Sequence, residues 1–333
     1  MRVCVLDSGR PRHPRVEPRV VESYNFVPEE DEYDWNGHST GVCGVIAGEP
    51  VELFNLRFTG VAPSAELITI KVLNYAGMGD VDWVLQGMEK AVEVGCDIIN
   101  MSLGDYIPCC SGPFRDIIVE GVKRGKIWVC ASGNAGPERG TIACPANVPE
   151  AIAVGSSSIV APEPDTVSWF SSRGPGPCNG VKPLLTAPGG NWIPSREDPN
   201  RAEVAEYIWT YWFDPTEPER PEKYWVVAGT SFSAPHVAGS LALIMEEVKP
   251  SLDKIVRGAK GYCRDIGEPG VDADSGYGRI DTYMMYKILT GVMPVIVTPI
   301  IERAREYKKY LVPIALSALA GIIIYGVIKK IST

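Results

Sequence analysis

The chain has 333 residues, of which 45% are hydrophobic, so it can form one large globular domain or two of ordinary size. Its 34 glycines and 28 prolines are scattered without a period, which excludes collagen-like and low-complexity proteins. The net charge of −9 disfavours a nucleic-acid-binding surface, because contacts to phosphate require a local excess of Lys and Arg. We therefore expect no nucleic-acid partner.

Apolar runs that indicate β-strands alternate with segments of helical periodicity along the first half of the chain. The expected strands are 3–6, 67–73, 97–101, 127–131 and 151–154, and the expected helices are 81–94 and 113–124. Strands that alternate with helices form a parallel sheet covered on both faces. The pattern predicts an α/β fold, a three-layer sandwich with a mostly parallel central sheet.

Residues 190–226 interrupt this alternation with a stretch rich in aromatic residues, carboxylates and prolines, which we interpret as an insertion. Within it, 207–213 is expected to form a strand. Two roles are open for this segment, an aromatic hairpin packed on the domain surface or a gate for substrate. Helices are expected at 231–248 and 251–260, and the domain is expected to end near residue 290.

An uncharged stretch at 311–328 follows this domain. At about 1.5 Å per residue it would be roughly 27 Å long, enough to cross a bilayer as a single C-terminal anchor. Residues 291–310 would form a linker or juxtamembrane helix, and 329–333 a short basic tail. A buried C-terminal helix is the alternative. Because more Lys and Arg precede the stretch than follow it, we expect the domain on the cytoplasmic side.

The nine cysteines are an odd number, so at least one of them is unpaired. Cys4 and Cys130 lie in apolar runs and are expected to be buried free thiols. In the loop-like sequence a disulfide or a metal site is open for Cys109, Cys110, Cys178 and Cys263. With three histidines and no paired C-x-x-C motif, we expect no structural zinc.

Four polar residues lie in short motifs that suit a catalytic site. Asp7 follows the first strand, at the strand end where parallel sheets build their sites. His38, in Asn36-Gly37-His38-Ser39-Thr40-Gly41, begins a run of small apolar residues. Ser231 follows Gly229-Thr230 at the start of a helix, where free N–H groups favour a developing oxyanion. Asn134 follows Ser132-Gly133 and can donate its amide to that same oxyanion.

In this chain order, the four residues resemble the subtilisin-like serine proteases, the subtilases. The resemblance covers about residues 1–290 and includes the segments 71–73, 100–104, 170–174 and 186–189. It implies a serine endopeptidase in which Ser231 attacks the peptide carbonyl, His38 takes and returns the proton, and Asp7 orients His38. Asn134 and the Ser231 N–H would hold the oxyanion.

The same resemblance implies where protein or peptide substrates bind. Two edge segments would pair with an extended peptide, one made of Gly77, Met78 and Gly79 and the other of Ser102, Leu103 and Gly104. The primary specificity pocket would be lined by Ala131, Ser132, Gly133 and Ala143. Because this pocket lacks a carboxylate, we expect hydrophobic or broad specificity rather than dibasic specificity.

The sequence departs from the family pattern in ways that predict altered properties. Ser39 and Gly41 stand where a glycine and a second histidine are common, and Phe232 replaces a frequent methionine, which predicts resistance to peroxide. Arg15 occupies an aspartate position of the usual calcium site, and the loop 53–57 offers few hard oxygen ligands. We therefore expect no cofactor and no metal at that site, while another calcium site stays open.

Three further questions are left open by the sequence. No propeptide precedes the first strand, so either the start is incomplete or the protein folds unaided. A catalytically silent pseudoprotease that binds peptides is the alternative to an active membrane-tethered endopeptidase. A tail-anchored scaffold is a third hypothesis.

Overall fold

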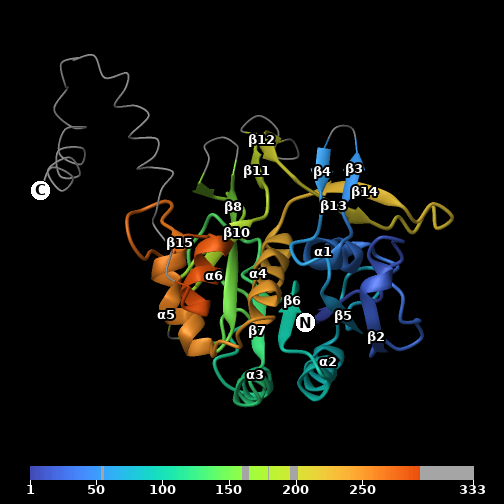
Figure 1. Cartoon of the computed structure of the whole chain (residues 1–333), viewed down its shortest axis with the longest axis horizontal. Coiled ribbons are helices and arrows are strands. Elements are labelled where there is room, and N and C mark those ends of the chain that lie inside the picture. Colours follow the sequence, from blue (N-terminus) through green and yellow to red (C-terminus); the bar gives the residue numbers. More distant parts are fainter. Residues whose placement is uncertain (54–55, 160–164, 179, 196–201, 293–333) are drawn as a thin grey trace, which may run out of the picture. The chain divides into compact units, whose positions relative to one another are not determined.

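The computed structural model describes residues 1–53, 56–159, 165–178, 180–195 and 202–292. In these residues a central sheet has the strand order β15-β16-β10-β8-β7-β6-β1-β5-β2, with β9 paired to β8 (Figure 1). The parallel strands are β1 (Arg2–Asp7), β2 (Val20–Asn25), β5 (Glu66–Lys71), β6 (Ile98–Met101), β7 (Ile127–Ala131), β8 (Ile152–Ser158), β10 (Leu185–Pro188) and β16 (Arg279–Ile280). The antiparallel strands are β9 (Thr166–Val167) and β15 (Cys263–Arg264).

Helices cover both faces of the sheet and bury a separate apolar core on each. One core includes α1 (His38–Ala47), α4 (Thr230–Met245), α5 (Leu252–Tyr262) and α6 (Thr282–Thr290). The other core includes α2 (Val81–Glu93) and α3 (Pro113–Lys123). A short 3₁₀ helix spans Glu17–Arg19. The predicted three-layer α/β arrangement is confirmed.

Two helices differ from the others in being buried on nearly all sides. Every residue of α1 after His38 is buried, and α4 exposes only a few of its side chains. Small residues allow this, because glycine, alanine and serine let neighbouring elements approach closely. The outer helices α2 and α5 are amphipathic and begin with ordinary caps, in which Asp80 and Ser251 accept backbone N–H groups.

The region predicted as an insertion forms two antiparallel hairpins. The first pairs β11 (Asn191–Pro194) with β12 (Ala202–Glu206), and the second pairs β13 (Ile208–Trp212) with β14 (Lys223–Val227). The strand expected at 207–213 is therefore present as β13. A further small hairpin joins β3 (Val51–Leu53) to β4 (Leu56–Phe58) and was not expected from the sequence.

The predicted C-terminal anchor lies outside the part of the chain that the structure describes. The stretch 311–328, the tail 329–333 and all but the first two residues of the linker 291–310 lie outside the described part of the chain. Among the residues that are described, no helix is both long and apolar enough to span a bilayer.

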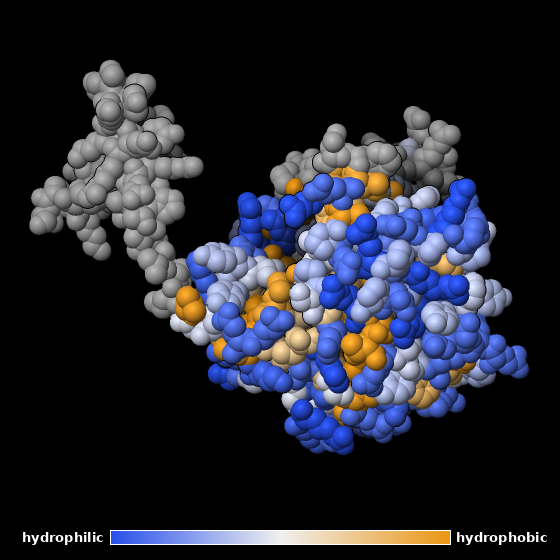
Figure 2. Space-filling model, turned by 45° about the vertical axis from the view of Figure 1, so that its right-hand side comes forward, coloured by the Kyte–Doolittle hydropathy of each residue, from blue (hydrophilic) through white to orange (hydrophobic). Residues whose placement is uncertain are grey.

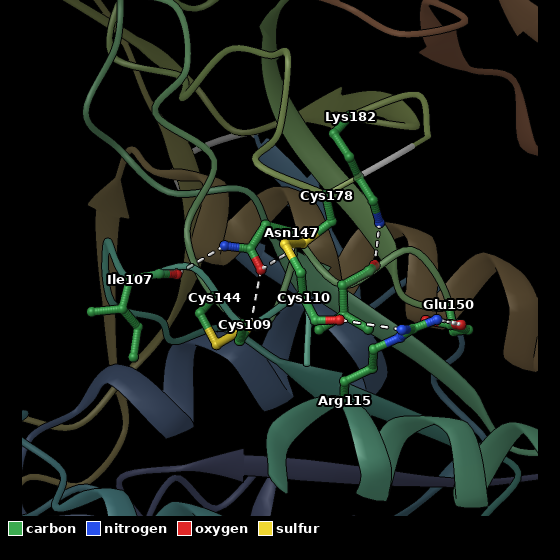
Figure 3. The surroundings of a disulfide bond; sticks show 10 residues. Ile107, Cys109, Cys110, Arg115, Cys144, Asn147, Glu150, Cys178 and Lys182 are labelled. Atoms are coloured by element: carbon green, nitrogen blue, oxygen red, sulfur yellow. Dashed lines mark hydrogen bonds and ion pairs between the residues drawn. A yellow bond between two sulfur atoms is a disulfide. The ribbon is translucent and has the colours of Figure 1, made fainter. Parts of the chain in front are cut away.

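Four of the nine cysteines form two disulfides, Cys109–Cys144 and Cys110–Cys178 (Figure 3). Two neighbouring cysteines of one loop are thus tied to two different segments. Cys144 was not among the residues for which a disulfide was expected. Cys4 and Cys130 are buried free thiols, as predicted, and Cys263 is also free.

Candidate active site

Asp7 and His38 meet at the carboxyl end of the central strand β1. Asp7 is completely buried, and its Oδ1 lies 2.8 Å from His38 Nδ1. The same oxygen accepts the backbone N–H of Ser8 at 2.8 Å. Because a carboxylate only accepts hydrogen bonds, Nδ1 carries the imidazole proton and Nε2 is left as the basic nitrogen.

His38 is the first residue of α1, and its side chain is 26% exposed to solvent. Burial by itself would lower the pKa of His38. The attraction of Asp7, the hydrogen bond to Asp7 and the more distant charge of Asp34 act in the opposite direction, and the net effect raises the pKa above its ordinary 6.5.

Asp34 is a buried carboxylate beside this pair that sequence reasoning missed. Its Oδ1 accepts hydrogen bonds from Ser8 Oγ at 2.9 Å and from the Gly37 N–H at 2.8 Å. Its Oδ2 accepts the N–H and the hydroxyl of Thr40 at 2.8 and 2.7 Å. Asp34 therefore holds both the turn before His38 and the first turn of α1. The available signal was an Asp three residues before a turn glycine, a common local pattern.

Ser231 lies in the first turn of α4, facing the end of β6. Its hydroxyl donates to the backbone carbonyl of Ser102 at 3.1 Å, and the Ser102 hydroxyl donates to the carbonyl of Ser231 at 2.7 Å. Ser231 and His38 line the same open cleft, which has a volume of about 750 Å³.

Asn134 is held in the same cleft by the residue that precedes Ser231. Its Oδ1 accepts the N–H of Thr230 at 3.0 Å and the hydroxyl of Thr230 at 2.9 Å. Since Oδ1 is engaged in this way, Nδ2 is the group that can donate to a ligand. The N–H of Asn134 donates to the Tyr106 hydroxyl at 2.9 Å.

Most of the residues predicted to bind substrate line this cleft: Gly77, Met78, Gly79, Ser102, Leu103, Gly104, Ala131, Gly133 and Ala143. Ser132 is completely buried and is not among the lining residues. Its burial follows from its place at the end of β7, where its N–H donates to the carbonyl of Val154 at 2.9 Å. Neither edge segment, 77–79 or 102–104, belongs to a sheet here.

The cleft also contains residues that the sequence did not single out. Tyr106 forms part of its wall beside Gly133, and Val81, Val84 and Phe114 add apolar surface. Among the described residues that line the cleft, Asp105 is the only carboxylate, and its Oδ1 accepts the N–H of Tyr106 at 2.7 Å. Val81 and Val84 belong to α2 and Phe114 to α3, whereas Asp105 and Tyr106 lie in a loop whose position depends on contacts distant in sequence.

Arg15, the residue for which the sequence predicted the loss of a calcium ligand, forms an ion pair. Its Nε donates to Glu222 Oε1 at 2.8 Å. Glu222 lies just before β14, so the ion pair ties the N-terminal region to the second hairpin. Across the described residues there is no group of three or more His, Cys, Asp or Glu side chains that could hold a metal ion.

Comparison with known proteins agrees with this geometry. The Subtilase family model matches residues 1–262. The chain is 34% identical over 262 residues to the serine protease AprX of Bacillus subtilis (strain 168), covering 74% of this chain and 57% of that protein. It is 35% identical over 265 residues to the major intracellular serine protease of the same organism, covering 76% and 71%.

Two further matches cover a larger share of the other protein. Subtilisin Savinase of Lederbergia lenta is 34% identical over 252 residues, which is 74% of this chain and 77% of that one. A lanthipeptide protease crystal structure has the same fold, with a TM-score of 0.68, 23% identity and coverage of 86% and 87%. The chain therefore belongs to the subtilase family and is a subtilisin-like serine endopeptidase.

Proposed function

We propose that this chain cleaves internal peptide bonds through an acyl-enzyme, with Ser231 as nucleophile, His38 as general base and acid, and Asp7 as the group that orients His38. The observation that carries the proposal is the 2.8 Å contact between Asp7 Oδ1 and His38 Nδ1. This contact fixes the tautomer in which Nε2 can accept a proton. A serine in the same cleft supplies that proton.

The reaction begins with a change of hydrogen-bond partner. The Ser231 hydroxyl leaves the carbonyl of Ser102 and turns to His38 Nε2, which takes its proton as Oγ bonds to the substrate carbonyl carbon. Asn134 Nδ2 and the Ser231 N–H donate to the oxyanion. His38 then protonates the amine, the C–N bond breaks, and water hydrolyses the acyl-enzyme by the same steps in reverse.

The proposed substrates are proteins or peptides bound in extended form between segments 77–79 and 102–104. The part of the cleft lined by Ala131, Gly133 and Ala143 presents small side chains, and Tyr106 lies beside Gly133. Asp105 is already engaged by the N–H of Tyr106. We therefore expect hydrophobic or broad preference before the cleaved bond, tested by a peptide library. A profile dominated by Arg or Lys would contradict it.

A fluorophosphonate probe separates the active enzyme from a silent peptide-binding protein. Such a probe bonds only to a serine that a neighbouring base activates. We expect labelling of the wild-type chain and none of Ser231→Ala, with Ser233→Ala as a matched control that keeps the neighbouring sequence. Folded wild-type protein that does not react would favour the silent alternative.

We further propose that 311–328 tethers the enzyme to a membrane, because this stretch is uncharged and long enough to cross. Deleting 311–333 should move the protein from the membrane fraction to the supernatant while fluorophosphonate labelling persists. Unchanged fractionation would overturn the tether, and lost function with intact labelling would favour the scaffold hypothesis.

Two features of the chain predict opposite orientations of this tether in the membrane. The Lys and Arg bias predicts a cytoplasmic catalytic domain, whereas two disulfides are typical of an oxidising compartment. Protease protection of sealed vesicles distinguishes the two, because a cytoplasmic domain is digested when the vesicles expose that face.

We also propose that the usual calcium site is lost, because Arg15 is paired with Glu222 where that site would require an anionic ligand. EDTA should then leave the unfolding midpoint of the purified protein unchanged. A large downward shift, reversed by calcium, would contradict this proposal.

Phe232 motivates a proposal about oxidation. It is 5% exposed, and its ring centroid lies 5.6 Å from that of His38. A methionine at this position would place an oxidisable sulfur beside the base. We expect wild-type activity to survive peroxide that inactivates Phe232→Met, and equal inactivation of the two would contradict the proposal.

A further inference from the structure

Four glycines mark one face of the segment that carries His38. They are Gly37, Gly41, Gly44 and Gly48, spaced by four, three and four residues, which places them in line along α1. The second hairpin of the insertion lies against this face, with β13 beside α1 (Figure 1). A side chain added at any of the four would meet atoms of residues 210–213.

Tyr211 fills the far half of this face. It is 1% exposed, and a Cβ at Gly44 or Gly48 would collide with its ring. Its hydroxyl donates to the carbonyl of Glu49, just beyond the end of α1. The aromatic ring is also enclosed by Phe58 and Tyr224, at centroid distances of 5.4 and 5.8 Å. The ring therefore cannot withdraw without opening a cavity.

Thr210 and Trp212 contact the half of α1 that is nearer to His38. The Thr210 hydroxyl donates to the carbonyl of Gly41 at 2.8 Å. A Cβ at Gly41 would lie 3.3 Å from Thr210 Cγ2 and 3.1 Å from Phe232 Cε1. The Trp212 ring reaches further, to 3.0 Å from a Cβ at Gly37, the residue before His38.

Phe213 joins the hairpin to the turn before His38. It is completely buried, and its ring meets that of Trp35 edge to face at 6.0 Å. The Arg12 guanidinium lies over both rings, 4.0 Å from the Trp35 centroid and 4.9 Å from that of Phe213. The hairpin is therefore attached on both sides of His38.

We propose that the β13–β14 hairpin is part of the catalytic apparatus, a brace that sets the position of His38, with Thr210 and Trp212 as its positioning residues. The inference rests on the proposed role of His38 as the base. Gly41 stands where the family commonly has a second histidine, and Thr210 together with Phe232 occupies the space a side chain there would take. The hairpin therefore packs against α1 at Gly41, where the helix itself has no side chain.

The brace matters because catalysis is sensitive to small displacements. A shift of about 1 Å in a catalytic group can lower the rate about 10²-fold. A single hydrogen bond of 2.8 Å joins the side chains of His38 and Asp7, and a rotation of α1 would lengthen it. A loosened hydrogen bond would also remove part of what raises the pKa of His38.

Thr210→Val tests the brace, since it keeps the shape of the side chain and removes the donor to Gly41. We expect kcat to fall about tenfold or more with KM nearly unchanged, and the acid limb of the kcat/KM profile to move to lower pH. Thr210→Ser restores the donor and should recover most of both. Tyr207→Ala is the control, because Tyr207 lies just before β13, outside the hairpin, and is 46% exposed.

A second variant keeps the test decisive if Thr210→Val folds poorly. Trp212→Phe retains an aromatic ring but loses the reach toward Gly37, and should slow fluorophosphonate labelling per folded molecule. Wild-type labelling rates and an unshifted pH profile in both variants would overturn the brace. Failure of wild-type protein to label would instead refute the proposed function, so the two failures are distinguishable.

Discussion

The hydroxyls of Ser231 and Ser102 each donate to the backbone carbonyl of the other residue, at 3.1 and 2.7 Å. This exchange joins the first turn of α4 to the end of β6 across the cleft. Ser102 Oγ also accepts Asn100 Nδ2 at 3.0 Å, so it is fixed from the sheet side. The position of the proposed nucleophile is therefore set by the edge segment that would bind substrate.

Ser102→Ala removes the hydroxyl that holds the Ser231 carbonyl. Because one hydrogen bond contributes about 1 kcal/mol, we expect kcat per titrated active site to fall about fivefold. Thermal unfolding should show a decrease of about 1 kcal/mol in the free energy of unfolding. An unchanged kcat in a correctly folded variant would show that Ser231 is positioned by α4 alone.

Asp34→Asn should shift the pH dependence of activity. His38 must be neutral to accept a proton, so activity is lost as pH falls through its pKa, which lies above 6.5. Removing the negative charge of Asp34 lowers the pKa of His38, and the acid limb of kcat/KM moves to lower pH. Asp31→Asn, an exposed carboxylate of the same loop, is the control and should leave the limb in place. Identical profiles for wild type and Asp34→Asn would refute the coupling.

The strands and helices of the central layers could be predicted because their signals are local. Apolar runs and helical periodicity located β1, β5, β6, β7, β8, α2 and α3, and glycine-flanked motifs located Asp7, His38, Asn134 and Ser231. Each of these signals spans only a few neighbouring residues. The fold then brings the motifs together, because strand ends and helix starts meet at one edge of a parallel sheet.

What the sequence did not predict depends on contacts between distant segments. In the sequence, Asp34 resembles any turn-forming aspartate. Only the structure shows that its carboxylate accepts five hydrogen bonds. Cys144 is separated by 35 residues from the cysteine it pairs with. Tyr106 reaches the cleft only because its loop folds back to Asn134. No local pattern carries such information.

His13 should make the folded state sensitive to acid. It is completely buried, with its ring 5.2 Å from those of Tyr211 and Tyr224, and burial is the main cause that lowers its pKa to about 4. Unfolding restores the ordinary pKa of 6.5, so the unfolded state binds the proton first as pH falls. This contribution to stability is complete above pH 6.5 and is lost progressively down to about pH 4.

The shift of His13 corresponds to about 3 kcal/mol between the two ends of this range. Denaturant unfolding at a series of pH values measures it, in Ser231→Ala protein so that self-digestion does not interfere. We expect His13→Phe to flatten the stability profile between these limits. A profile as steep as that of Ser231→Ala alone would assign the acid sensitivity to other groups.

The two disulfides should differ in their effect on substrate binding although they contribute similarly to stability. They close loops of 35 and 68 residues, for which chain entropy predicts about 4 kcal/mol each. Cys144 lines the cleft beside Ala143 and exchanges backbone hydrogen bonds with Asp105, so the first disulfide ties one wall of the cleft to the loop that carries Cys109. Cys110 and Cys178 are not among the lining residues.

Replacing both cysteines of each pair by serine separates the two roles. We expect both double variants to unfold at lower denaturant concentration, because each loses a crosslink of the unfolded chain. Only the variant at Cys109 and Cys144 should raise KM for peptides with a bulky apolar residue before the cleaved bond, since the cleft wall at Cys144 can then move. Equal KM values in the two variants, at equal stability loss, would show that the backbone pairing of Asp105 with Cys144 holds the pocket without the sulfur bridge.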